Sequence, residues 1–179
     1  MIPSGSYVGP GELGRLLWGA LRLRVETYAE AARVPESWRL CTAIAILGGA
    51  AYGIRLAAYS GLSAIVLAVD RILIVLGQTF FETAIVWLIG IAVLRKSVQY
   101  TQVFRPVALA RAPQLLYLVL ALFEAPAVAG VVVSVWLLAA FAAAIRGALD
   151  TGWLLAIAIV LVLGIAGELL SRAAPLLPT

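Results

Sequence analysis

Two polar side chains stand within a long apolar stretch of the chain. Gln78 and Glu82 are four residues apart within Ile72–Leu94, and residues at that spacing share one face of a helix. An acid at the centre of a membrane-spanning helix costs on the order of 3 kcal/mol, so such residues often belong to proton relays or ion sites. The alternative is structural: Glu82, protonated or hydrogen-bonded, ties helices together or docks a neighbouring subunit. A single midspan acid in a chain without His favours the structural interpretation.

A second group of charged residues falls at the expected cytoplasmic ends of helices. Arg146 and Asp150 are four residues apart and would pair if their helix continues. Pro113 has no amide hydrogen, so a carbonyl in the preceding turn is left without its helical hydrogen bond. Arg111 could bind that carbonyl or an anionic lipid headgroup. The alternative, a ring of charges that fixes the topology, is the commoner role. The candidate docking or headgroup site consists of Arg105, Arg111, Arg146 and Asp150.

Other chemistry lacks the residues that it needs. The chain has one Cys, Cys41, and no His, so a zinc site, a disulfide within the chain or a Ser–His–Asp triad is excluded. Cys41 is expected to be a small buried filler. Gly49 and Gly53 form a GxxxG pair, which is a candidate helix-packing face. The spacing leaves open whether that face meets another helix of this chain or another protein.

The composition of the chain indicates a membrane protein rather than a soluble one. Of the 179 residues, 64% are hydrophobic and 12% are charged, against about 45–50% and about 25% in typical soluble domains. A soluble fold of this length could not bury that excess. We therefore expect an all-α, polytopic membrane helix bundle of about five transmembrane helices, preceded by an amphipathic interfacial helix.

The expected elements follow from hydropathy and charge. Residues 1–38 hold a flexible start and an amphipathic helix over Glu12–Arg33, which either lies at the headgroups with Trp18 and Tyr28 or packs on the protein's own cytoplasmic face. Residues 39–172 form the transmembrane domain, and 173–179 a short tail. A short apolar piece, Leu62–Val69, is closed by Asp70–Arg71, so 40–69 is either one span or a re-entrant pair. Glu124–Ala125 is expected to be a tight turn. The five expected spans are Leu40–Ala58, Ile72–Leu94, Val103–Phe123, Pro126–Ile145 and Trp153–Leu170.

The distribution of basic residues predicts the orientation. With the N-terminus inside, ten basic residues lie on the cytoplasmic side and three outside, which the positive-inside rule favours. The three outer residues are Arg55, Arg71 and Arg172. The ten inner ones are Arg15, Arg22, Arg24, Arg33, Arg39, Arg95, Lys96, Arg105, Arg111 and Arg146.

Three segments resemble the Yip domain family of Ypt/Rab-interacting membrane proteins, particularly its bacterial members. They are Arg105–Pro113 (RPVALARAP), Trp136 followed by Ala144–Asp150 (AIRGALD), and Ala20–Tyr28 (ALRLRVETY). Two positions depart from the pattern: Ala108 stands where the family usually has Gly, and Arg111 where it often has Gln. The resemblance implies a five-helix membrane domain with a cytoplasmic N-terminus. Eukaryotic members are associated with small GTPases and vesicle traffic, whereas bacterial members have no settled function.

The functional expectation is a non-catalytic membrane module. It would lie in the bacterial inner membrane, with its N-terminus cytoplasmic and its C-terminus outside. It would bind membrane lipids and other membrane proteins or itself, and an accessory subunit of a larger membrane complex is one form of this hypothesis. No enzymatic activity, cofactor, metal or nucleic-acid partner is expected. The alternative is a small transporter or a proton or ion pathway that uses Glu82 and Gln78.

Overall fold

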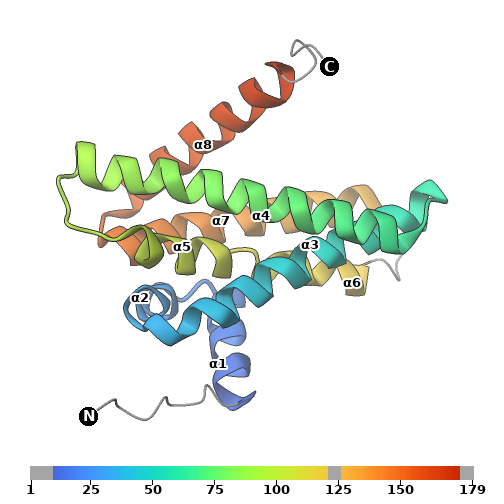
Figure 1. The fold of residues 1–179 in the computed structure, drawn as a ribbon, viewed down its shortest axis with the longest axis horizontal. Coiled ribbons are helices and arrows are strands. Elements are labelled where there is room, and N and C mark those ends of the chain that lie inside the picture. Colours follow the sequence, from blue (N-terminus) through green and yellow to red (C-terminus); the bar gives the residue numbers. More distant parts are fainter. Residues whose placement is uncertain (1–9, 121–125, 174–179) are drawn as a thin grey trace.

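The computed structural model describes residues 10–120 and 126–173, and every regular element in those two ranges is helical (Figure 1). This confirms the expected all-α membrane architecture. The elements are α1 (Pro10–Leu21), α2 (Val25–Arg33), a 3-10 turn (Pro35–Ser37), α3 (Trp38–Ser60), α4 (Ala64–Leu88) continued by a π-helical turn (Ile89–Val93), α5 (Tyr100–Leu109), a 3-10 turn (Ala112–Leu115), α6 (Leu116–Leu120), α7 (Pro126–Leu149) and α8 (Trp153–Ala173).

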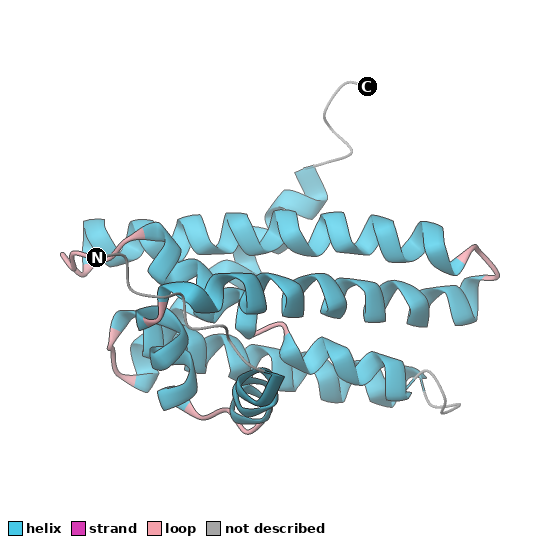
Figure 2. Ribbon diagram, turned by 60° about the horizontal axis from the view of Figure 1, so that its bottom comes forward, coloured by secondary structure: helices cyan, strands magenta, loops and turns pink. Residues whose placement is uncertain are grey.

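Helices α3 and α4 form an antiparallel hairpin that runs the length of the bundle (Figures 1 and 2). The chain reverses at Gly61, whose φ of 69° is left-handed and therefore suits glycine. Because α3 is an unbroken helix of 23 residues, the re-entrant alternative for 40–69 is wrong. The second span is also longer than expected, since it begins at Ala64. Asp70–Arg71 lies inside this helix, because adjacent charges, unlike Gly or Pro, do not end one.

The hairpin is held by backbone-to-backbone contact at the two glycines of the GxxxG pair. A Cβ at Gly49 would lie 2.9 Å from the Cα of Ile72, and a Cβ at Gly53 would lie 2.5 Å from the Cα of Ala68. Both glycines thus face α4 of the same chain. The contact that the sequence left open is therefore an internal one.

The third expected span is broken. Helix α5 ends at Leu109, a 3-10 turn follows from Ala112, and α6 begins at Leu116, where a continuous helix was expected over Val103–Phe123. Pro113 is the local cause, because it cannot donate a hydrogen bond to the carbonyl four residues earlier. The expected turn at Glu124–Ala125 lies outside the described residues.

The N-terminal region consists of two helices rather than one. The chain turns at Leu23, which has a φ of 56°, and α2 packs on α5 and α7. Tyr28 is fully buried and donates a hydrogen bond to the carbonyl of Ala20 at 3.0 Å, so its expected place at the interface is wrong; burial raises its pKa. For α2, the alternative of packing on the protein itself is the correct one. Trp18 is 58% exposed, as an interfacial residue would be.

Four segments are long and apolar enough to cross a membrane. They are Pro35–Ala58, Ala64–Val93, Tyr100–Leu120 and Gly130–Leu149. The fifth expected span corresponds to α8, a helix of 21 residues, which is about 32 Å long at 1.5 Å per residue. Its described apolar part, Trp153–Ala166, is shorter than the roughly 20 residues that a span needs. Helix α8 leaves the bundle at an angle (Figure 1).

The glycine contacts predict how the hairpin responds to added methyl groups. Gly53→Ala should lower the free energy of unfolding by about 1–3 kcal/mol, because the methyl group would overlap the α4 backbone. Gly77→Ala is the matched control in α4, since a Cβ at Gly77 would meet nothing within 4 Å; it should be neutral or stabilising. Thermal unfolding in a mild detergent measures both. Equal effects of the two variants would contradict the close approach of α3 and α4.

Candidate functional site

The centre of the bundle contains an ion pair. Arg111 donates from Nη2 to the Oε2 of Glu82 at 2.6 Å, and from Nε to the Oγ1 of Thr79 at 3.2 Å. The hydroxyl of Thr79 in turn donates to the carbonyl of Val75 at 2.7 Å. The guanidinium also lies over the ring of Phe141 in α7, 4.9 Å from its centroid. Arg111 therefore connects α4, the break after α5, and α7.

The break in the third span is what positions Arg111. The amide of Ala110 donates to the carbonyl of Pro106 at 2.9 Å and that of Arg111 to Ala108 at 3.1 Å, so the last turn tightens to the 3-10 spacing. The amide of Gln114 then donates to the carbonyl of Arg111 at 2.9 Å. This carbonyl packs against Gly48 of α3, where a Cβ would lie 3.2 Å away. The backbone of Arg111 thus contacts α3 while its side chain reaches α4.

The two charges of the pair differ in their access to the surface. The side chain of Arg111 is 4% exposed and that of Glu82 is 23% exposed. Removing one member of a buried pair leaves the other charge without a partner and typically costs about 3–5 kcal/mol. The pair therefore stabilises the packing between helices, which is the structural role that the sequence favoured for Glu82.

The structure does not join Gln78 to this pair. Gln78 is exposed on the surface of α4, whereas Glu82, one turn later, points toward Arg111. The depth of Gln78 and Glu82 in the span also differs from that expected for Ile72–Leu94. Because the span runs from Ala64 to Val93, Gln78 lies at its midpoint and Glu82 is nearer to its cytoplasmic end as the sequence orients it.

The four residues of the candidate docking site are spread over different environments. Arg111 is in the buried pair. Arg105 is also buried: its Nε donates to the carbonyl of Thr101 at 2.9 Å, while its Nη1 has no hydrogen-bond partner among the described residues. Arg146 is half-buried, with its guanidinium 4.7 Å from the ring centroid of Trp153. Only Asp150 is exposed.

The expected helical pairing of Arg146 with Asp150 is wrong, because α7 ends between them. Its last residue is Leu149, and Asp150 has a φ of 45°. Instead, Lys96 donates from Nζ to the carbonyls of Leu149 and Asp150, the latter at 2.8 Å. A cation at the carbonyl end of a helix is stabilised by the helix dipole. Sequence reasoning had no signal for this contact, which joins positions more than 50 residues apart.

The sequence analysis also gave no signal for a stack of two tyrosine rings with an arginine on either side. The guanidinium of Arg71 lies 5.6 Å from the ring centroid of Tyr52, the rings of Tyr52 and Tyr117 are 5.1 Å apart, and Arg55 lies 4.5 Å from Tyr117. Such cation–π contacts are favourable when desolvated. Arg55, one of the three basic residues expected on the outer side, is only 8% exposed.

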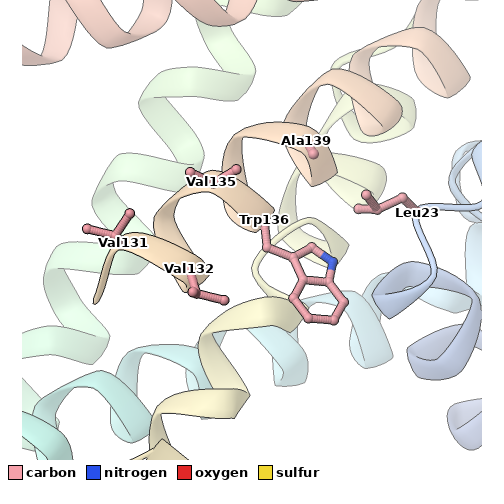
Figure 3. A pocket seen from close by; sticks show the side chains of 6 residues that line it. All are labelled: Leu23, Val131, Val132, Val135, Trp136 and Ala139. Carbon is pink, nitrogen blue, oxygen red and sulfur yellow. The ribbon is translucent and has the colours of Figure 1, made fainter. Parts of the chain in front are cut away.

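An open, entirely apolar groove runs along α7 beside the turn between α1 and α2 (Figure 3). Its volume is about 430 Å³. Trp136 forms one wall and donates from Nε1 to the carbonyl of Leu21 at 3.0 Å, which ties the N-terminal helices to α7. The groove has no polar group that would select a particular ligand. Its lining residues are Leu23, Val131, Val132, Val135, Trp136 and Ala139.

Across the described ranges, no three His, Cys, Asp or Glu residues lie close enough together to hold a metal ion. Comparison with known proteins gave no match to a family model, to a curated protein or to a solved structure.

The geometry predicts strong coupling between Arg111 and Glu82. Glu82→Gln should lower the free energy of unfolding by about 3 kcal/mol, because it leaves the guanidinium of Arg111 buried without a counter-charge. The double variant with Arg111→Met should lose less than the sum of the two single variants. Unfolding in mixed micelles with a rising fraction of denaturing detergent measures each variant.

The exposed pair between α1 and α2 supplies the control. Arg15 binds Glu30 at 2.5 and 2.9 Å, and this bond holds the pKa of the Glu30 carboxyl below its usual range. Both side chains are exposed, at 58% and 38%, so Glu30→Gln should cost less than about 1 kcal/mol. If the free energies of unfolding lost by the Arg111 and Glu82 single variants simply add in the double variant, the central pair does not stabilise the bundle.

Proposed function

We propose that this protein is a non-catalytic membrane module that binds other membrane proteins or lipids, in the form of an accessory subunit of a larger membrane complex. The observation that carries the proposal is the surface of α8. Leu154, Leu161 and Ile165 are 85%, 62% and 62% exposed. Of the side chains described in α8, only Ala156, Ile159 and Val160 are buried.

A helix with so little contact to its own bundle suits an attachment role. Helices in membranes associate through close packing rather than through exclusion of water. Helix α8 has an apolar surface on several sides and leaves the bundle at an angle (Figure 1). Another membrane protein that packs on α8 would gain contacts that the bundle does not supply.

We further propose that the module belongs to the Yip domain family and lies in the bacterial inner membrane, with the N-terminus cytoplasmic. The support is the three sequence segments and the distribution of basic residues. In the structure the Arg105–Pro113 segment is buried throughout, with Val107, Ala108 and Leu109 at 0%, and Ala144 and Ile145 are fully buried, whereas only Ala20 and Tyr28 of the Ala20–Tyr28 segment are buried. A resemblance in buried positions supports a shared architecture more than a shared partner.

The ion pair disfavours the transport alternative. A carboxylate that carries protons across a membrane must bind and release them, whereas Glu82 is bonded to Arg111 at 2.6 Å. Gln78 lies apart from that pair on the surface of α4. The two residues therefore do not line a common path.

The proposal predicts stoichiometric co-purification. The tagged protein, captured from native membranes in a mild detergent, should elute with one large membrane complex, and its partners can be identified by mass spectrometry. Leu154→Ser with Leu161→Ser should weaken that association, because these substitutions place hydroxyls on the exposed face of α8. Recovery of the wild-type protein alone, at the size of its own monomer or oligomer, would contradict the accessory role.

A flux assay separates the two functions. Proteoliposomes with the wild-type protein should show no proton flux above protein-free vesicles under an imposed pH gradient, and Glu82→Gln should not change this. A flux that Glu82→Gln abolishes, while the elution volume of the variant stays normal, would establish the transport function instead.

A further inference from the structure

Gln78 is an exposed amide at the midpoint of the apolar segment Ala64–Val93. Within the described part of the chain its amide has no hydrogen-bond partner, unlike the buried Thr79 and Thr83, which bond to their own helix. An unpaired amide is costly in the hydrocarbon core of a membrane, where no water is available to bind it. The group therefore favours contact with another polar group in the membrane.

The residues around Gln78 form a seam of the kind that pairs helices. Ile74, Gln78, Phe81 and Ile85 alternate at spacings of four and three, which is the heptad pattern of left-handed helix pairs. Ile74 and Phe81 are 38% and 41% exposed, and Ile85 is partly exposed. These four residues are called the α4 seam below. A single polar residue in such a seam fixes register and partner number.

Both flanks of the α4 seam suit a close approach. On one side, Gly77 has no side chain, and a Cβ there would meet nothing within 4 Å. On the other side lies the partly exposed side chain of Glu82, whose charge is already balanced by Arg111. The surface therefore offers a narrow apolar contact with one hydrogen-bonding group at its centre.

We propose that the α4 seam is a homodimer interface, in which Gln78 of one copy hydrogen-bonds to Gln78 of a second copy. An amide carries both a donor and an acceptor, so it is complementary to itself. Two copies inserted in the same direction are related by a two-fold axis along the membrane normal. This axis brings identical residues together at the same depth, which a different protein would match only by carrying its own polar group there.

Cysteine cross-linking tests the interface directly. Cys41 is fully buried, so the wild-type chain is the control for the native thiol. In proteoliposomes under mild oxidation, Ile74→Cys and Phe81→Cys should form disulfide-linked dimers. Leu73→Cys is the matched control: it is 65% exposed at nearly the same depth, but turned by about 100° around the helix. It should cross-link at the background level set by random collision.

A substitution series tests the amide itself. Gln78→Leu should weaken dimerisation about 3- to 30-fold, as measured by energy transfer between labelled copies at increasing dilution in lipid. Gln78→Asn keeps an amide and should retain most of the affinity. Both replacements are on an exposed surface, so the monomer should stay folded, which circular dichroism and elution volume check.

Three outcomes would overturn the proposal. One is cross-linking at residue 74 no stronger than at residue 73. Another is equal association of Gln78→Leu and Gln78→Asn. A photo-cross-linker at residue 78 that captures a different protein in native membranes, with no dimer in proteoliposomes, would also refute self-association. The proposed dimer does not involve α8. If the wild-type protein forms the α4 dimer but does not co-purify with a larger complex, this result counts against the accessory role alone.

Discussion

The ion pair between Arg111 and Glu82 is the constraint on which the central packing depends. Neither charge is tolerable alone in an apolar interior, so the two must meet. For that to happen, the third hydrophobic segment has to break at Arg111, which lets the backbone contact Gly48 in α3 while the side chain reaches α4. Phe141 of α7 covers the guanidinium. The ion pair thereby connects α3, α4, α5 and α7.

Other polar groups of the bundle also connect separate segments. Lys96 binds the carbonyl end of α7, Tyr28 binds Ala20, and Trp136 binds Leu21. Each of these bonds joins segments that the chain itself does not hold together. Small residues supply the remaining fit, since Gly49 and Gly53 allow α3 and α4 to approach at the backbone. Among the described residues, some polar side chains connect helices in this way, whereas others, such as Thr42 and Thr83, bond within their own helix.

The surface divides into two parts with different physical character. Helix α8 is apolar and exposed on several sides, and it is suited to packing against another protein. Helix α4 is also exposed, but it carries an amide at mid-depth, which favours a partner with a matching amide. The two surfaces are on separate helices, so a dimer through α4 leaves α8 accessible to a further subunit.

The sequence by itself determined the fold class and most of the helices, and it favoured a structural role for Glu82. Hydropathy reports which residues avoid water, and it can be read along each segment of the sequence. The tertiary structure alone decided that Glu82 binds Arg111 rather than acting with Gln78, that α4 begins before Asp70–Arg71, and that the helix containing Arg146 stops at Leu149. The pairing of Glu82 and the contacts at the end of α7 depend on residues far apart in the chain. Periodicity along one segment carries no information about which distant charge or carbonyl will lie beside it.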